Sequence, residues 1–172
     1  MARSYEFYVG VGSNKNAETN ILAALVALAG SVELLAVSTF YRNPAYDDPG
    51  FPPYVNGVVK GRTKLGPEDL KRQVLSAVET SLGRHASDGT PIDLDLLFYT
   101  DWPDATHGLS LPHPLVTTRP YMAIPFAEIT GNITLPGCDD SMASIAARYR
   151  RASLTPMPEL TAKLRTLVNP HG

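Results

Sequence analysis

The order of elements in this 172-residue chain predicts an α+β fold, with a ferredoxin-like βαββαβ core and additional C-terminal helices. Segments with alternating apolar residues, which are typical of half-buried strands, are interrupted by two segments with apolar residues at helical spacing. The resulting order is strand, helix, strand, strand, helix, strand, which places helices over one side of an antiparallel sheet. Because no repeat or linker divides the chain, we expect a single domain over residues 1–172.

The N-terminal third supplies three of the four core strands and the first helix. Apolar residues alternate over residues 7–11, and turn-forming residues follow. Helical spacing over residues 18–30 predicts a helix, and Gly30 suits a left-handed C-cap. Strands are expected at 32–40 and 54–59, with a long loop rich in proline and aspartate between them.

The second core helix is the clearest element of the sequence, at residues 66–83. Pro67 fits its first turn, acidic residues follow at its positive end, and Gly83 ends it. The last core strand is expected at 92–99, where apolar and acidic residues alternate. Three further helical patterns follow the core, at residues 120–129, 141–151 and 157–168.

Composition excludes several classes of protein. The formal net charge is -2 and the basic residues are scattered, which argues against a nucleic-acid partner. Cys138 is the only cysteine, so an intrachain disulfide and a cysteine zinc site are excluded. The longest apolar stretch, residues 21–29, is too short to span a bilayer, and the N-terminus lacks the apolar run of a secretory signal. We therefore expect a cytoplasmic protein without a membrane partner, as a monomer or weak homodimer.

Two carboxylates in the last core strand are the first candidate for chemistry. Asp93 and Asp95 are two residues apart, so in a strand they share a face and lie about 7 Å apart along it. Carboxylate pairs of this kind hold Mg²⁺, which also keeps waters and phosphate oxygens as ligands. The alternative is a pair of solvated acids on the exposed face of an edge strand.

Motifs around the carboxylates have a specific order. Gly83 and Arg84 precede the acidic strand, and the sequence LPHP at 111–114 follows it. The segments VGVGSN, STFYRNP and PYVNGVV stand upstream, and RPYMAIPFAEI follows LPHP. This ordered set resembles the 6-hydroxymethyl-7,8-dihydropterin pyrophosphokinase family over about residues 5–130. The resemblance implies transfer of diphosphate from ATP to the pterin hydroxymethyl group in folate biosynthesis, with release of AMP.

On the phosphate side, the resemblance implies a set of charged residues. Asp93 and Asp95 would hold two Mg²⁺ ions between ATP and the pterin. His113 and Arg119 would contact the triphosphate, with Ser110 nearby. The implied catalytic residues are Arg84, Asp93, Asp95, His113 and Arg119.

On the pterin side, the resemblance implies aromatic and amide groups. Tyr54 and Tyr121 would sandwich the ring, and Asn56 would bond its polar edge, because an amide offers a donor beside an acceptor. Backbone groups around Asn43 and Tyr46 would complete the pocket. Taken one at a time, each of these residues has an ordinary structural alternative, and only their joint order favours the site.

The chain departs from the family in the segment before the acidic strand. That segment is short, lacks an aromatic residue, and has Thr90 where the family has an arginine. Gly108 also replaces a common phosphate-binding arginine, while the role of Glu79, in the second core helix, stays open between a family acid and a solvated carboxylate. An alternative function is therefore a pterin-binding paralogue with weak or no transferase activity. An RNA-binding module of the same fold is disfavoured by the net charge and the absence of an aromatic RNA-binding motif.

Overall fold

A six-stranded antiparallel sheet forms the centre of the protein, described by a computed structural model over residues 2–83 and 88–168. The strand order is β5-β1-β4-β3-β6, and β2 pairs with β4 on the same edge as β3. With β2 and β3 taken together, this is the order of the predicted ferredoxin-like core. The strands are β1 (Tyr5–Ser13), β2 (Glu33–Val37), β3 (Tyr41–Asn43), β4 (Tyr54–Thr63), β5 (Asp93–Tyr99) and β6 (Thr155–Pro156).

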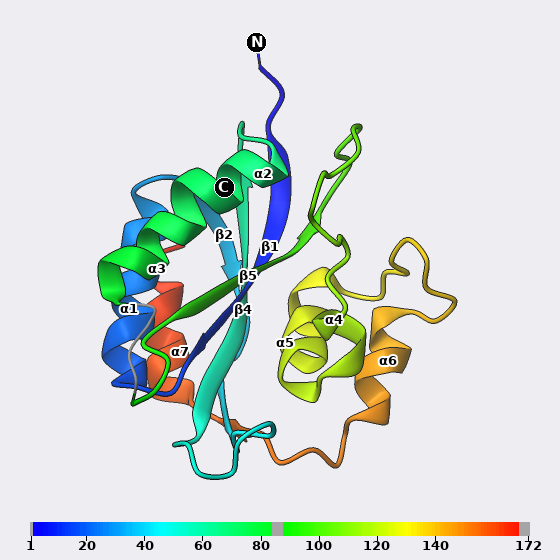
Figure 1. Ribbon diagram of the computed structural model, residues 1–172. Coiled ribbons are helices and arrows are strands. Elements are labelled where there is room, and N and C mark those ends of the chain that lie inside the picture. Colours follow the sequence, from blue (N-terminus) through cyan, green and yellow to red (C-terminus); the bar gives the residue numbers. More distant parts are fainter. Residues whose placement is uncertain (1, 84–87, 169–172) are drawn as a thin grey trace.

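Helices cover both faces of the sheet (Figure 1). On one face lie α1 (Ala17–Ala29), the helix formed by α2 (Pro67–Asp69), η1 (Leu70–Leu75) and α3 (Ser76–Leu82), and α7 (Pro158–Arg165). On the other face lie α4 (Leu115–Thr118), α5 (Pro120–Thr130) and α6 (Met142–Arg148). The expectation that helices cover one side holds for the core helices alone, because the added helices divide between the two faces.

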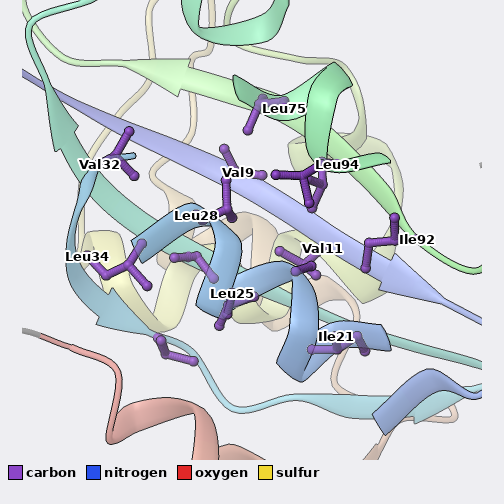
Figure 2. Close-up of a cluster of buried hydrophobic side chains, with 14 of the residues drawn as sticks. Val9, Val11, Ile21, Leu25, Leu28, Val32, Leu34, Leu75, Ile92 and Leu94 are labelled. Atoms are coloured by element: carbon purple, nitrogen blue, oxygen red, sulfur yellow. The ribbon is translucent and has the colours of Figure 1, made fainter. Parts of the chain in front are cut away.

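Strand alternation produces two separate cores. Val9 and Val11 of β1 point into the cluster that α1 and the second core helix cover, which Figure 2 shows. Tyr8 points the other way, into a cluster with Phe126 of α5. The same alternation in β5 buries Leu94 among the first cluster and turns its acidic neighbours toward α5.

The predicted strand at 32–40 is broken into β2 and β3. Phe40 is the cause, because its ring lies against Gly57 of β4, where a Cβ would come within 2.5 Å of the ring. Its backbone N–H donates to Thr161 Oγ1 of α7 at 2.9 Å instead of continuing a ladder with β4. This break brings α7 back against the first face of the sheet.

The second core helix runs without interruption through a π-helical segment, η1. Gly83 ends it, as the sequence predicted, and is a left-handed C-cap with φ of 86°. Gly30 is the C-cap of α1, as predicted, but the left-handed conformation expected there is wrong, because its φ is -75°. Glu79 is 3% exposed, so the alternative of a solvated helix carboxylate is also wrong. None of the described helices is both long and apolar enough to cross a membrane.

Candidate active site

A pocket of about 420 Å³ lies on the α5 side of the sheet, at the N-terminal end of that helix. Strands β1, β4 and β5, the loop between β3 and β4, and the start of α5 line it. The structure thereby brings together residues that are up to 112 positions apart in the sequence, from Gly10 to Met122. The predicted site residues in its lining are Asn43, Tyr46, Tyr54, Asn56, Asp93, Asp95 and Tyr121.

Two glycines of β1 form the floor of the pocket. Gly10 pairs with Asp95 and Gly12 with Asp93, so no β1 side chain stands beside the carboxylates. A Cβ on Gly12 would lie 2.5 Å from Asn56 Oδ1, and one on Gly10 would lie 2.6 Å from Met122 Sδ. Both distances are shorter than real contacts, so these positions require glycine for the neighbouring side chains to keep their places.

Asp93 and Asp95 lie on one face of β5 and both are half-buried in the pocket lining, as the strand spacing predicted. Among the described residues, no group of three or more His, Cys, Asp or Glu side chains is arranged to hold a metal. A pair of carboxylates fits Mg²⁺ that takes its remaining ligands from water and phosphate, since this ion is commonly bound through one or two carboxylates. The donor set is therefore suited to a metal that arrives with a nucleotide.

Two buried amides form one wall of the pocket. Asn56 on β4 is 5% exposed and Asn43 on β3 is 3% exposed. Asn56 Nδ2 donates to Asn43 Oδ1 at 2.8 Å, and Asn43 Nδ2 donates to the carbonyl of Pro44 at 2.9 Å. These bonds fix which side of each amide faces the pocket, which is what hydrogen-bond recognition of a ring edge needs.

Aromatic rings complete that wall. Tyr54 and Tyr121 both line the pocket, as predicted, and burial raises the pKa of the Tyr121 hydroxyl. Tyr46 was assigned through its backbone alone, yet its ring stacks on Tyr121 with centroids 5.9 Å apart and planes 17° apart. A ligand ring inserted between two protein rings would hold those two rings about 7 Å apart, twice the ~3.5 Å contact distance. The Tyr46 and Tyr121 rings are closer than that, so they leave no room for a ligand ring between them. Tyr46 and Tyr121 therefore contact each other directly.

The predicted phosphate-binding residues lie outside the pocket lining. His113 is half-buried, and its Nδ1 accepts from the Leu115 backbone N–H at 3.2 Å, so the neutral ring carries its proton on Nε2. Burial lowers the pKa of His113, as does the positive charge of Lys71, while the negative charge of Asp93 opposes them. A neutral ring with an Nε2–H donor on the Asp93 side of the pocket is suited to a phosphate oxygen.

Arg119 and Ser110 are exposed. Arg119 is the N-cap of α5 and pairs with Asp47 of the opposite loop at 3.9 Å, so its charge stands beside the pocket mouth. Ser110 lies in the loop after β5. Arg84 lies outside the described residues. We call Ser110, His113 and Arg119 the phosphate-side rim. We call Asn43, Tyr54, Asn56 and Tyr121 the pterin-side wall.

Thr90, which stands in place of a family arginine, also lines the pocket. It is half-buried and bonded to the turn after β1 rather than extended toward solvent. Lys15 of that turn pairs with Asp88 at 2.6 Å, so part of its charge is already neutralised. Arg42, a second candidate for compensating charge, is exposed on β3 and is not in the pocket lining.

Sequence reasoning missed three contributors: the Tyr46 ring, the glycine floor and Thr90. The glycines had a local signal, because Gly10 and Gly12 alternate with buried Val9 and Val11 and so mark an open sheet face. The other two depend on contacts between distant segments, for which the sequence holds no local signal.

The fold and pocket define a class of protein: a ferredoxin-like α+β domain in which paired carboxylates face a pocket of amide and aromatic groups. Comparison with known proteins gives the particular family. The family model described as 7,8-dihydro-6-hydroxymethylpterin-pyrophosphokinase matches residues 8–131, and the chain belongs to this family. The sequence-based resemblance is thereby confirmed.

Curated relatives carry the corresponding name, 2-amino-4-hydroxy-6-hydroxymethyldihydropteridine pyrophosphokinase. One from Synechocystis sp. is 35% identical over 127 residues, which cover 70% of this chain and 64% of that protein. One from Aquifex aeolicus is 32% identical over 133 residues, which cover 75% of this chain and 82% of that protein. The match thus spans just under two thirds of the first relative and most of the second.

Among solved structures, the fold is similar to the Plasmodium falciparum HPPK-DHPS protein with pteroate. The TM-score is 0.67 at 11% identity, and the match covers 86% of this chain and 43% of that one. At this identity the likeness concerns the fold alone. The likeness confirms the α+β fold predicted for this chain.

Proposed function

We propose that this chain transfers diphosphate from ATP to the hydroxymethyl group of 6-hydroxymethyl-7,8-dihydropterin, the reaction of folate biosynthesis named for its family. The observation that carries the proposal is the placement of Asp93 and Asp95 on the same pocket as Asn56 and the tyrosines. Carboxylates suit the metal of a nucleotide, and amides with aromatic rings suit a flat polar heterocycle. One pocket therefore serves both substrates.

The chemistry needs no nucleophile from the protein. The hydroxymethyl oxygen of the pterin attacks the β-phosphorus of ATP and loses its proton. The bond from that phosphorus to the oxygen bridging it to the α-phosphorus breaks, and AMP leaves with the bridging oxygen. Magnesium held by Asp93 and Asp95 would supply positive charge against the phosphate oxygens.

The protein's own residues position the reactants and offset charge, which are the main contributions to catalysis of phosphoryl-type transfer. Asn56 and Asn43 hold the polar edge of the ring, and Tyr54 and Tyr121 lie against its faces. His113 donates from Nε2 to a phosphate oxygen, and Arg119 places its guanidinium beside the triphosphate at the pocket mouth. Arg84 would add a second guanidinium, and Ser110 a hydroxyl.

The remaining expectations belong to the same proposal: a single domain over 1–172 that is cytoplasmic, monomeric or weakly dimeric, and without a nucleic-acid partner. The net charge of -2 with scattered basic residues supports the last of these expectations, that no nucleic acid is bound. The sequence-based alternative of a pterin-binding paralogue gains no support from the relatives described above, which carry the name of the transferase.

The test is incubation of the protein with ATP, magnesium and 6-hydroxymethyl-7,8-dihydropterin, with AMP measured by chromatography. AMP should form in proportion to enzyme and only when the pterin is present. Pterin binding without AMP would instead support the binding paralogue. Neither AMP nor pterin binding would reject the pocket as a pterin site.

A further inference from the structure

A hydroxyl contact joins Tyr54 of the pterin-side wall to Thr90. Tyr54 Oη lies 3.1 Å from Thr90 Oγ1, a hydrogen-bonding distance at which either atom can donate. Tyr54 begins β4, whereas Thr90 lies 36 residues later, just before β5. The contact therefore connects the ring-binding strand to the segment that leads into the carboxylate strand.

The backbone of Thr90 is held at both of its polar groups. Its N–H donates to Asn14 Oδ1 at 2.6 Å, and its carbonyl accepts from the Asn14 N–H at 3.0 Å and from Ser13 Oγ at 3.2 Å. Asn14 is 6% exposed and Ser13 is fully buried, so both partners are buried groups at the end of β1. The position of the Thr90 hydroxyl is consequently fixed by the protein core.

The same buried amide holds the other side of Tyr54. Asn14 Nδ2 donates to the Pro52 carbonyl at 3.4 Å, and Pro52 is two residues before Tyr54. One asparagine side chain thus bonds both the backbone that leads into Tyr54 and the residue that contacts the Tyr54 hydroxyl. These bonds restrain the Tyr54 side chain at two points, through the backbone before it and through its hydroxyl.

We propose that Thr90 is a positioning residue, whose hydroxyl holds the Tyr54 ring in the orientation that stacks on the pterin. The inference rests on the proposed function. A half-buried tyrosine without such a contact samples other rotamers and must be ordered when ligand binds, which weakens binding. A ring held in advance avoids that loss.

This role explains how a short polar residue serves at a place where the family has an arginine. The Thr90 side chain reaches Tyr54 and the pocket wall. With threonine at this position, the side chain acts on the pterin ring through Tyr54 and does not act on the phosphates. Replacing Thr90 should therefore change the affinity for the pterin.

The test is a double-mutant cycle with Thr90→Val, Tyr54→Phe and the double variant, each of which removes one or both hydroxyls while keeping side-chain volume. Dissociation constants for 6-hydroxymethylpterin are measured by fluorescence titration, and those for a non-hydrolysable MgATP analogue by calorimetry. Each single variant should weaken pterin binding about threefold to tenfold, the range for loss of one modest contact or one ordered side chain. The double variant should be no weaker than either single, and the nucleotide affinity should be unchanged.

Two further variants separate positioning from general damage. Thr90→Ser restores the hydroxyl and should recover most of the pterin affinity. Thr130→Val removes a matched hydroxyl that bonds the Phe126 carbonyl at the far end of α5, and it should bind pterin as the wild type does. A general loss of structure would instead change nucleotide affinity and melting temperature along with pterin affinity.

Wild-type pterin affinity in Thr90→Val, or additive effects in the double variant, would overturn the inference while leaving the proposed function in place. Absence of pterin binding and of AMP formation in the wild type would overturn both. The AMP assay on the wild type thus distinguishes the two failures.

Discussion

The pterin-side wall lines the pocket, whereas the phosphate-side rim lies outside the lining, and the two groups of residues are held in different ways. Asn56 and Tyr54 lie on the central strand β4 and are bonded through their side chains to Asn43 and Thr90. In the rim, Arg119 is exposed and its ion pair with Asp47 spans 3.9 Å. Ring recognition is thus built into the sheet, whereas charge for the phosphates depends on side chains that must settle when the nucleotide binds.

The largest expected effect is the loss of AMP formation when one of the two β5 carboxylates, between the wall and the rim, is replaced. Asp93→Asn and Asp95→Asn should each lower AMP formation by about 10³-fold, because a metal supplies several kcal/mol of charge stabilisation. Asparagine keeps the shape of the side chain, so the fold should persist. Steady-state AMP release and calorimetry with MgATP are the measurements.

Asp139→Asn is the matched control, since Asp139 is an exposed acid before α6 and outside the pocket lining. It should leave rate and nucleotide affinity unchanged. Unaltered MgATP binding in both strand variants would remove the basis for placing the metal on β5.

The second prediction isolates the rim. Arg119→Ala should lower kcat by about 10²-fold, as loss of one group that stabilises transition-state charge does. Pterin affinity should stay within about twofold of wild type, because Arg119 is not in the pocket lining. Kinetics with both substrates at saturation, together with pterin titration, measure the two effects.

Arg148→Ala offers a control for loss of an exposed guanidinium, because Arg148 on α6 pairs with Asp140 away from the pocket. A parallel loss of pterin affinity in Arg119→Ala would show that wall and rim are not independent. In that case the comparison between them would no longer hold.

The third prediction concerns the floor that supports the wall. Gly12→Ala places a Cβ 2.5 Å from Asn56 Oδ1 and so must displace the amide. Pterin binding should weaken by about 1–3 kcal/mol, the range expected for Asn56→Ala itself, because either change leaves a polar group of the ring unpaired. The affinity for a MgATP analogue should change little.

Gly50→Ala is the matched control, since its Cβ would approach Asp48 Oδ1 only to an ordinary 3.4 Å. Wild-type pterin affinity in Gly12→Ala would mean that Asn56 can move without consequence. The amide wall would then be less rigid than its hydrogen bonds indicate.

The smallest expected effect is a pH dependence in the rim. Burial lowers the pKa of His113 below its ordinary 6.5, so the ring is neutral in the free protein at pH 7. Bound phosphates would favour the charged ring, and binding would then take up a proton. MgATP affinity should therefore rise as pH falls from 7 to 6, by at most about tenfold, the limit for one proton.

Because ATP itself titrates in this range, the measurement is the difference between wild type and His113→Gln. The variant should bind MgATP with a shallower dependence on pH. Identical pH profiles would show that His113 does not contact the phosphates.

Local patterns were sufficient to predict most of the core elements. Alternation located β1, β4 and β5, and the spacing of apolar residues located α1 and the second core helix. The break between β2 and β3 was not predictable, because it depends on Thr161 accepting a bond from Phe40, 121 residues away. The right-handed C-cap at Gly30 was also missed, since glycine permits both conformations.

Some residues of the candidate site were also predictable from local patterns, and others were not. Residues two apart on a strand, such as Asp93 and Asp95, converge as predicted because strand geometry alone places them on one face. The Tyr46 ring and Thr90 were missed, because their contacts join segments brought together only by the folded chain. The proposed roles of His113 and Arg119 stay predictions that the experiments above test.

The position of β5 at the end of the strand order has a consequence for self-association. An edge strand carries backbone groups that can pair with a strand of another molecule, and charged side chains discourage this pairing. Two copies aligned along β5 would bring four carboxylates together, and their repulsion opposes such growth. The acids proposed to hold the metal would thus also help to keep the free protein from aggregating, and replacing both with asparagine should promote aggregation on storage.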